Sequence, residues 1–364
     1  MIHLDHLLDA TKGILRYSGK QRHFDAFGHD SRQLTPGEMF VAVRGEHGNG
    51  HDYLLDAVRR GATGLLVEDR FMNALSEEDQ KALEQADVAA IVVEDTRIAL
   101  QHYARAILEQ WHPIVIAVTG STGKTSTKEA IAAVLGSSFA TFKSWQNYND
   151  LLGLPLSLGR LEERHEYAVL ELGCDHPGEI RNLCQMIHPQ MGVLTNISQT
   201  QLQYFGDVER LADELCALLT FLPQEGAAVI NGDDAMVRRA LRNVGDKLRA
   251  SLVPFVASMT QNVQVLWDGI RYDLPIGDNE VMQLQSFLLG AHHVNTMLAA
   301  YTIGRLCGLR PEEIRHALAK VRPLAGRLNT LEGVGSAMLL DDTHNAAPAS
   351  MIAGLETLKA LPTN

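Results

Sequence analysis

The chain has 364 residues, 46% of them hydrophobic and 21% charged, with a formal net charge of −12. This balance is typical of a globular protein in water, and the length predicts two or three domains. An acidic chain is a poor partner for nucleic acid, and no apolar run in the sequence approaches the roughly 20 residues that span a bilayer. The cysteines form no Cys-x-x-Cys pair, and the N-terminus lacks the basic and apolar regions of a secretion signal. We therefore expect a cytoplasmic protein with reduced thiols that neither binds nucleic acid nor inserts into a membrane.

The first 110 residues predict a small α/β unit. Strand-like and helix-like stretches alternate here. A turn and then a strand are expected within 35–44, further strands at 63–67 and 88–93, and helices at 54–60 and at 96–111, the latter with Asp95-Thr96 at its start. A glycine-rich stretch at 45–50 interrupts them, but its glycines do not have the spacing of a dinucleotide fingerprint. On the residues alone it is a loop, and contact with a ligand stays an open alternative.

A phosphate-binding loop is predicted after the next apolar run, residues 113–118. The sequence Gly120-Ser-Thr-Gly-Lys-Thr125 follows this run, and a helical pattern begins at once. Backbone N–H groups in such a turn and at a helix N-terminus bind anions. Lys124 can reach terminal phosphates, and the Thr125 hydroxyl can bind Mg²⁺. The common pattern has a glycine where Val118 stands, and the alternative is an ordinary turn whose lysine is merely solvated. The residues assigned to the nucleotide phosphates are Gly120, Ser121, Thr122, Gly123, Lys124, Thr125 and Ser126.

The pattern from 113 to about 320 predicts a mostly parallel sheet covered by helices on both faces. Strands are expected at 113–118, 167–172, 191–195 and 227–231, with helices between them. Polar residues end the last three strands, at the edge where such sheets bind ligands: Glu171, Thr195-Asn196 and Asn231-Gly-Asp-Asp234.

Glu171 ends an apolar run, where an uncompensated carboxylate would be costly. A Mg²⁺ beside Thr125 would offset that cost, and an arginine partner is the structural alternative. The alternative for Asn231–Asp234 is a plain turn.

The remaining sequence predicts antiparallel strands and then the start of another unit. The sequence pattern at 252–288 predicts β-strands, and a helix is expected to begin at 290–295. A connector is expected around Gly326-Arg327. A strand pair at 328–331 and 336–340 and a helix at 348–361 follow. One such unit is too small to bury its own apolar face, so we expect the sequence to be a fragment or a truncated chain.

Several stretches together resemble the Mur ligases, the ATP-dependent amide-forming enzymes of peptidoglycan synthesis. The resemblance covers essentially the whole chain. The matching stretches are Asp30-Ser-Arg32, Gly50-His51, Thr119–Thr125, Asn147-Tyr-Asn149 through Pro155, Glu171-Leu-Gly-Cys-Asp-His-Pro-Gly-Glu-Ile180, Asn231–Asp234, Gly326-Arg327 and Asp341-Asp-Thr-His-Asn345. Within the family, the chain looks most like the branch that joins D-Ala-D-Ala to UDP-MurNAc-tripeptide.

The resemblance implies an α/β protein with the three-domain Mur ligase architecture. It implies a UDP-substrate-binding domain at 1–110, a central ATP-binding P-loop domain at 111–322, and the start of a Rossmann-like ligase domain at 323–364. It also implies a monomer that uses ATP and Mg²⁺. The substrate carboxylate would attack the γ-phosphate of ATP, and the amine would then displace phosphate from the acyl phosphate.

The resemblance also assigns roles to single residues. Lys124, Glu171 and Arg327 would be catalytic, and Thr125 and Glu171 would hold Mg²⁺. His293, Asp341 and Asn345 would add to the ATP site. The residues implied at the substrate are Ser31, Arg32 and His51 near the uridine nucleotide and Asn147 and Asn149 in the central cleft.

Some positions depart from the family pattern. Gln201 stands where the family has a histidine at a second Mg²⁺, and Leu215 and Ala217 stand at the Lys-x-Glu positions whose lysine is carbamylated. His293 and Thr296 replace two asparagines on the adenine side. We therefore consider three hypotheses. The first is an active ligase, the second is a nucleotide-binding paralogue with weak or no ligase activity, and the third is another ligase of the superfamily. The Asp30-Ser-Arg32 domain speaks against folylpolyglutamate-synthase-like or cyanophycin-synthetase-like enzymes.

Overall fold

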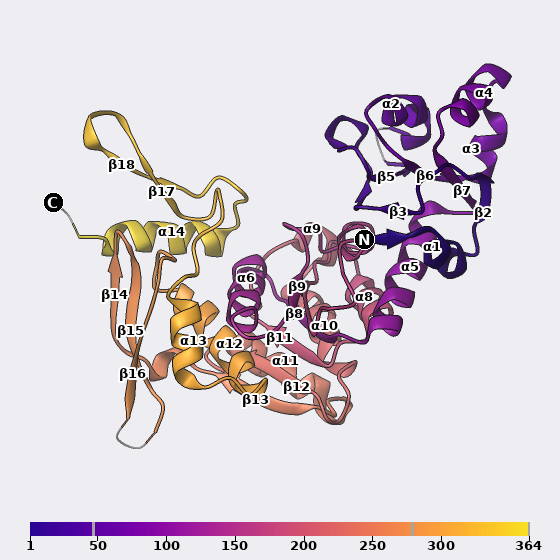
Figure 1. The fold of residues 1–364 in the computed structure, drawn as a ribbon. Helices are drawn as coiled ribbons and strands as arrows, with labels where there is room; N and C mark the ends of the chain where they lie inside the picture. Colours follow the sequence, from indigo (N-terminus) through magenta and orange to yellow (C-terminus); the bar gives the residue numbers. More distant parts are fainter. Residues whose placement is uncertain (46–47, 278–279, 363–364) are drawn as a thin grey trace. The chain divides into compact units, whose positions relative to one another are not determined.

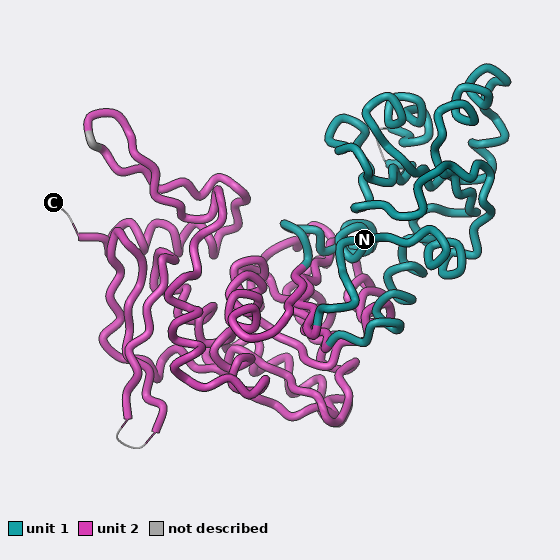
Figure 2. Tube along the Cα trace, viewed as in Figure 1, with its two compact units in different colours: residues 1–113, 144–165 teal, residues 114–143, 166–364 magenta. Residues whose placement is uncertain are grey.

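The structure is a computed structural model that describes residues 1–45, 48–277 and 280–362. The chain forms two compact units (Figure 2). Unit 1 contains residues 1–113 and 144–165, and unit 2 contains residues 114–143 and 166–364. The segment 144–165 joins unit 1 because its helix packs beside an earlier helix there, with Gln101 Nε2 donating to the Leu151 carbonyl at 3.2 Å. The predicted three-domain division stays a prediction.

Unit 1 is built on a mixed sheet with the strand order β2-β7-β6-β5-β4. Its strands β4 to β7 pair in parallel, and β2 pairs antiparallel with β7. Every residue of β6 and β7 is buried, as expected for strands covered on both faces. The strands are β2 (Ile14–Tyr17), β4 (Phe27–Gly28), β5 (Met39–Val41), β6 (Gly64–Glu68) and β7 (Ala89–Val93), with β1 (Ile2–His3) and β3 (His23–Phe24) as a separate antiparallel pair.

Helices cover this sheet and carry side chains that fix their ends. Asp95 accepts hydrogen bonds from the Arg97 and Ile98 N–H groups and so begins α5, as the Asp95-Thr96 sequence predicts. The helices of unit 1 are α1 (Leu4–Thr11), α2 (Leu54–Arg59), α3 (Asp69–Ala74), α4 (Glu77–Gln85), α5 (Thr96–Trp111) and α7 (Gly153–Leu158), with 3₁₀ turns η1 (Ser31–Gln33) and η2 (Gly50–Tyr53).

Unit 2 is built on a parallel sheet with the strand order β13-β12-β11-β8-β10-β9. The predicted α/β class and central parallel sheet are confirmed. The strands are β8 (Ile114–Thr119), β9 (Thr141–Lys143), β10 (Tyr167–Glu171), β11 (Met191–Leu194), β12 (Ala227–Asn231) and β13 (Ser251–Phe255).

One prediction about this sheet is wrong. We expected the strands from residue 252 onward to pair in antiparallel fashion, but β13 pairs parallel with β12. The reason is the crossover helix α11 (Ala235–Val244), which returns the chain to the same end of the sheet before β13 begins.

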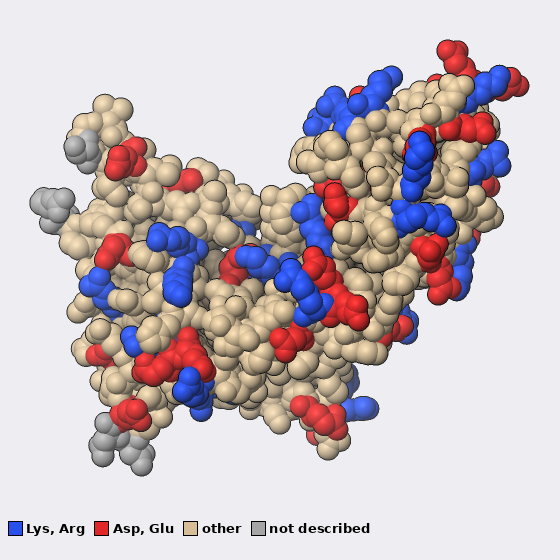
Figure 3. All heavy atoms as spheres, viewed as in Figure 1, with Lys and Arg blue, Asp and Glu red and all other residues tan. Residues whose placement is uncertain are grey.

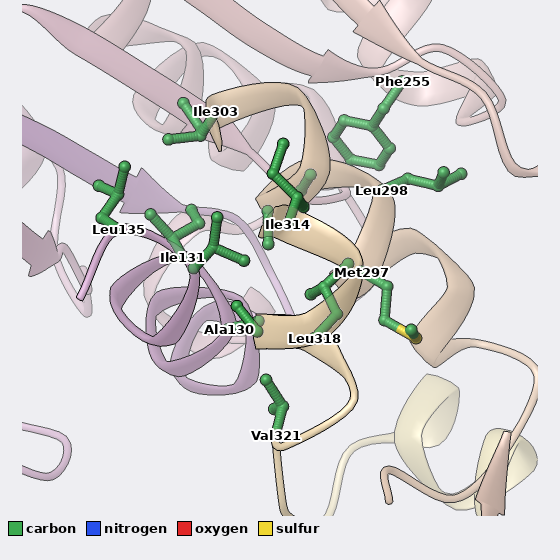
Figure 4. Packing of buried hydrophobic residues seen from close by; sticks show 14 of the residues in the cluster. Ala130, Ile131, Leu135, Phe255, Met297, Leu298, Ile303, Ile314, Leu318 and Val321 are labelled. Carbon is green, nitrogen blue, oxygen red and sulfur yellow. The ribbon is translucent and has the colours of Figure 1, made fainter. Parts of the chain in front are cut away.

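The helices of unit 2 enclose the main apolar core. Side chains of α6 (Lys124–Leu135), α12 (His293–Leu306) and α13 (Pro311–Leu318) point toward one another in Figure 4. This packing holds α6, and with it the loop at its N-terminus, rigidly against the sheet. The other helices are α8 (Glu179–Ile187), α9 (Leu202–Phe205), α10 (Val208–Thr220) and α14 (Pro348–Ala360), with 3₁₀ turns η3 (Gly245–Lys247), η4 (Ala257–Met259) and η5 (Val334–Ser336).

Two further antiparallel elements complete unit 2 (Figure 1). The strands β14 (Gln261–Leu266), β15 (Gly269–Pro275) and β16 (Val281–Ser286) form the predicted antiparallel sheet, and β17 (Asn329–Glu332) pairs with β18 (Met338–Asp341) as predicted. Among the described residues, no helix has the length and apolar character needed to cross a membrane.

Candidate active site

The register of the parallel sheet brings three strand ends together. Glu171 at the end of β10 pairs with Val118 of β8, and Leu194 at the end of β11 pairs with Thr119. The loops after β10 and β11 therefore flank the glycine-rich turn that follows β8. This is the edge where parallel sheets bind ligands.

The turn after β8 has a backbone that needs glycine. Gly120 has φ +140°, and a Cβ atom there would lie 2.0 Å from Thr195 Oγ1. Gly123 has φ +76° and immediately precedes α6. The first N–H groups of a helix have no partner within the helix, so this turn presents donors and the positive end of the helix dipole to an anion.

The loop after β11 braces this turn. The side chain of Asn196 accepts from the Thr122 N–H at 3.1 Å and donates to the Thr122 carbonyl at 3.0 Å. Thr195 Oγ1 donates to the same carbonyl at 2.7 Å, and the Ser121 N–H donates to the Asn196 carbonyl at 2.9 Å. The predicted polar strand end at Thr195-Asn196 thus shapes the phosphate loop.

Lys124 curls over the loop that precedes it. Its Nζ donates to the carbonyl of Gly120 at 2.8 Å and to that of Ser121 at 3.3 Å. Burial lowers the pKa of this amine, and the nearby Glu171 carboxylate opposes that shift. The side chain therefore lies folded back on the loop, with its amine bonded to the carbonyls of the loop itself. A merely solvated lysine does not fit this geometry.

Glu171 is 1% exposed and sits among cations. Its charge acts on Lys124, Lys128 and Arg327, raising the pKa of each against the effect of burial. Arg327 also donates from Nη2 to Thr125 Oγ1 at 3.1 Å. The structure therefore brings together the predicted catalytic residues of unit 2, and it supplies the arginine neighbour that the sequence left open.

The oxygen donors here also fit a magnesium ion. Mg²⁺ prefers hard oxygen ligands and uses one or two protein groups beside phosphate oxygens. The Thr125 hydroxyl and the Glu171 carboxylate supply such atoms beside the anion-binding turn.

Other residues predicted for the ATP site divide into two groups. His293 is 6% exposed, lies within 3.3 Å of Thr296 Oγ1 through Nδ1, and has its pKa lowered by burial and by His292 and Arg327. It therefore lies near Arg327 as a neutral ring. Asp341 instead accepts from the Gly326 N–H at 3.1 Å, which fixes the residue before Arg327. Asn345 is exposed and accepts from the N–H of its own neighbour Ala346.

The polar end of β12 is a structural turn. Asp234 accepts from the Met236 and Val237 N–H groups and begins α11. Asp233 accepts from Ser258 at 2.7 and 2.8 Å. These contacts favour the plain-turn alternative for this segment.

The residues at the positions that depart from the family pattern pack in the core or form hydrogen bonds within the protein. Leu215 is 2% exposed, on the buried face that α10 shares with Leu211 and Leu218. Its neighbour Glu214 accepts from the Gly178 and Ile180 N–H groups, each at 2.8 Å, at the start of α8. Gln201 donates from Nε2 to Asp175 at 2.7 Å. A buried leucine supplies no oxygen, so these residues do not fit a second cation bridged by a lysine carbamate.

A separate pocket of about 1140 Å³ lies in unit 1, and predicted substrate residues line it. Ser31 donates to Asp56 at 2.8 Å, and Arg32 binds Asp30 through Nε and Nη2 at 2.9 and 2.8 Å. The hydrogen bonds from Arg32 lower the pKa of Asp30 to about 2. Basic side chains gather over α2 on the face seen in Figure 3. The arginines of the pocket are Arg32, Arg59, Arg60 and Arg97.

The histidine predicted for this pocket has both ring nitrogens engaged. His51 is 4% exposed, contacts Asn49 Oδ1 through Nδ1 at 2.7 Å and accepts from the Glu68 N–H through Nε2 at 3.1 Å. His51 therefore shapes the wall of the pocket and has no ring nitrogen left for a ligand. Residues 46 and 47 of the predicted loop lie outside the described residues.

The two asparagines predicted for the central cleft lie in the segment 144–165 of unit 1. Asn147 is exposed and Asn149 is half-buried. Trp145 and Asp150 anchor this loop, since the Trp145 N–H donates to Ser157 Oγ at 2.7 Å and Asp150 accepts from the N–H at the start of α7. This anchoring was not predicted, because no motif in the segment indicates it.

Sequence reasoning also missed two buried charged residues. Lys128 is fully buried, one turn after Lys124, and pairs with Glu129 at 3.2 Å. The i, i+4 spacing from Lys124 could have drawn attention to it. Glu68 is 2% exposed at the end of β6 and pairs with Arg44 and Arg70.

Comparisons with known proteins agree with this arrangement. Residues 118–304 match the family model described as the Mur ligase middle domain, and residues 23–107 match that of the Mur ligase family, catalytic domain. The chain is 31% identical to the UDP-N-acetylmuramoyl-tripeptide–D-alanyl-D-alanine ligase of Escherichia coli strain K12, over 99% of this chain and 76% of that protein. It is 29% identical to the Bacillus subtilis protein of the same name, over 91% of this chain and 69% of that protein.

Solved structures are similar too. A crystal structure of MurF from Acinetobacter baumannii matches with a TM-score of 0.80 at 26% identity, over 100% of this chain and 77% of that one. The MurF ligase of Thermotoga maritima in complex with ADP matches with a TM-score of 0.75 at 26% identity, over 93% of this chain and 75% of that one.

Proposed function

Because the chain belongs to the Mur ligase family, we propose that it is an ATP-dependent ligase that joins D-alanyl-D-alanine to UDP-MurNAc-tripeptide and releases ADP and phosphate. The observation that carries this proposal is the convergence of Lys124, Glu171 and Arg327 on the phosphate loop. The agreement with relatives of that name over 91% and 99% of the chain supports the substrates.

The first step transfers the γ-phosphoryl group of ATP to the terminal carboxylate of the tripeptide. The turn at Gly120–Gly123 and the α6 N-terminus bind the phosphates through N–H groups. Lys124 releases its contacts with the Gly120 and Ser121 carbonyls and turns its amine to the phosphate oxygens. Arg327 adds a second positive group beside Thr125. Positioning and charge neutralisation supply most of the rate enhancement in such transfers.

The second step forms the amide bond. The amine of D-Ala-D-Ala attacks the acyl carbon, the C–N bond forms, and the C–O bond to phosphate breaks. The proton of the amine leaves with solvent or phosphate. Lys124 and Arg327 stabilise the departing phosphate as they stabilised its transfer.

The proposal includes a magnesium ion. Thr125 Oγ1 and the Glu171 carboxylate would hold it, and the ion would neutralise charge on the phosphate oxygens. Thr125 would then give up its hydrogen bond from Arg327, which frees that guanidinium for the nucleotide. His293 would lie on the nucleotide side of Arg327 as a neutral group.

The proposal also covers the binding of UDP-MurNAc-tripeptide, the location of the enzyme and its oligomeric state. We assign the pocket of unit 1 to the uridine diphosphate end of the substrate, because several arginines line it. Asn147 and Asn149 would contact the substrate nearer its peptide, and Asp341 and Asn345 would act from the segment that follows Arg327. The enzyme would be a cytoplasmic monomer acting on charged small molecules.

The test is product formation by the purified protein. ATP, Mg²⁺, UDP-MurNAc-tripeptide and D-Ala-D-Ala should yield the UDP-MurNAc-pentapeptide by mass spectrometry, with ADP in equal amount. Omitting any one component should abolish the product. If ATP and the uridine nucleotide bind but no pentapeptide forms, the ligase assignment is wrong and the chain is a nucleotide-binding relative.

A further inference from the structure

The loop at 45–50 forms part of the wall of the unit 1 pocket. Gly45, Gly48, Asn49 and Gly50 line the pocket. On either side of residues 46 and 47, the Gly45 N–H donates to the Gly48 carbonyl at 2.9 Å and Arg44 pairs with Asn49 in a β-bridge. It also packs tightly on the strand before it, since a Cβ atom at Gly50 would lie 2.6 Å from the Val43 nitrogen. The positions of Gly45 and of residues 48–50 therefore shape this part of the wall.

His51, the residue that follows the loop, is hydrogen-bonded to the backbone of Glu68. The Glu68 N–H donates to His51 Nε2 at 3.1 Å. This bond requires an unprotonated Nε2, so the proton of the neutral ring lies on Nδ1, which faces Asn49 Oδ1 at 2.7 Å. The His51 ring also stacks on Phe71 with 4.1 Å between centroids. The C-terminal end of the loop is therefore held by the backbone of Glu68.

The residue that precedes the loop is fastened to the same glutamate. Arg44 Nε donates to Glu68 Oε1 at 3.1 Å, and Arg70 donates to Oε2 through Nε and Nη2 at 3.0 and 2.8 Å. The carboxylate is 2% exposed, so these charge-assisted bonds compensate its burial. One residue thus holds both ends of the loop, through its carboxylate at Arg44 and through its N–H at His51.

We propose that Glu68 is a positioning residue that clamps Arg44 and His51, the residues on either side of the 45–50 loop, and so sets the affinity of the unit 1 pocket for the uridine nucleotide substrate. The identity of that ligand rests on the proposed function, whereas the clamp rests on the contacts above. Glu68 and His51 act through the residues that line the pocket and not through direct contact with the ligand.

The clamp predicts a dependence on pH. Burial lowers the pKa of His51, while the charged groups around the ring act in both directions: Glu68 and Asp52 raise it, and Arg44 and Arg70 lower it. Protonation would place a hydrogen on Nε2 facing the Glu68 N–H, and the bond would be lost. The clamp is therefore intact at neutral pH and opens as the pH falls toward the lowered pKa of His51.

The first experiment measures the loop without any ligand. Hydrogen exchange of peptides that cover residues 43–52 should be faster in Glu68→Ala and His51→Ala than in the wild type, and intermediate in Glu68→Gln and His51→Gln. Gln at position 51 can still accept from the Glu68 N–H, so it tests rescue. Glu94→Gln is the matched control, because Glu94 is an exposed carboxylate after the neighbouring strand β7. Unchanged exchange in both alanine variants would overturn the clamp.

The second experiment measures the substrate. In Glu68→Ala the KM for UDP-MurNAc-tripeptide should rise about tenfold with kcat nearly unchanged, as expected for loss of a charge-assisted contact. In the wild type this KM should rise as the pH falls, and in His51→Gln it should become nearly independent of pH. Affinity for an ATP analogue at the phosphate loop should stay unchanged in every variant, because that loop lies in unit 2. An unchanged thermal unfolding profile by circular dichroism should show that unit 1 is folded.

The outcomes separate the two proposals. A wild-type protein that does not bind UDP-MurNAc-tripeptide contradicts the proposed function, and hydrogen exchange then decides the clamp alone. A wild type that binds the substrate, beside folded Glu68→Ala and His51→Ala variants with unchanged KM and pH profile, overturns the role of Glu68. Glu68→Gln keeps the side-chain length, so it serves if the alanine variant does not fold.

Discussion

At the scale of single residues, Lys124 is the group on which the proposed chemistry depends most. Its amine already lies at the phosphate loop, 2.8 Å from the Gly120 carbonyl. Lys124→Ala should lower kcat by about 10²–10³-fold, since a positive group is lost where charge develops on the phosphoryl oxygens. The thermal midpoint by circular dichroism should change little. Lys247→Ala, an exposed lysine of the same unit, is the control. Turnover that survives Lys124→Ala would contradict the assignment of the loop.

Glu171 tests the magnesium site at the same scale. Glu171→Gln removes the negative charge among Lys124, Lys128 and Arg327 and replaces a metal ligand by a weaker one. The Mn²⁺ concentration that half-saturates binding of an ATP analogue should rise about tenfold or more. Glu166→Gln is a matched control, because Glu166 precedes the other end of the same strand and is exposed. An equal Mn²⁺ dependence in both variants would remove Glu171 from the site.

At the scale of elements, the phosphate loop depends on two glycines for different reasons. A Cβ at Gly120 would clash with Thr195 Oγ1 at 2.0 Å, whereas one at Gly123 meets nothing within 4 Å and suffers only the positive φ. Gly123→Ala should cost about 1–2 kcal/mol of stability. Gly120→Ala should cost more and also disrupt nucleotide binding. Urea unfolding and ATP-analogue titration measure both effects, and equal costs for the two variants would contradict the bracing by Thr195.

Helix α10 carries a prediction about metal content. Leu215 faces the core, and Glu214 is committed to the start of α8. Turnover should therefore be the same in bicarbonate-depleted and bicarbonate-supplemented buffer, and ¹³C NMR with labelled bicarbonate should show no lysine carbamate. Leu215→Lys alone should give no bicarbonate-dependent gain, because Gln201 and Ala217 also differ, and Leu215→Met should behave like the wild type. A carbamate signal or a strong CO₂-dependent gain would show that α10 still supports a second cation.

The elements also show how far the sequence predicts the structure. The apolar runs in the sequence correctly predicted β8, β10, β11 and β12, because a strand covered on both faces is continuously hydrophobic. The parallel pairing of β13 was not predicted, because residues 251–255 are equally compatible with a parallel and with an antiparallel strand. The union of 144–165 with unit 1 and the clamp at Glu68 arise from contacts between residues distant in sequence, for which a single sequence carries no local signal.

The site was predictable to the extent that its residues lie at strand ends. Glu171 ends β10, and Lys124 and Thr125 begin α6 directly after the turn that follows β8, so the register of β8 and β10 brings the three together. Arg327 lies about 200 residues from Thr125 in the chain, and only the family resemblance pointed to it. Its contact with Thr125 Oγ1 is a finding of the structure.

In the whole molecule, ATP and the peptide substrate must meet in one reaction. The phosphate loop lies in unit 2 and the arginine-lined pocket lies in unit 1. We propose that the substrate carboxylate receives the γ-phosphoryl group before the amide bond forms.

Oxygen tracing tests that claim most directly. UDP-MurNAc-tripeptide labelled with ¹⁸O in its terminal carboxylate should be incubated with ATP, Mg²⁺ and D-Ala-D-Ala, and the released phosphate analysed by mass spectrometry. We expect one ¹⁸O atom in each phosphate released and one retained in the new amide. Unlabelled phosphate, or AMP in place of ADP, would contradict it.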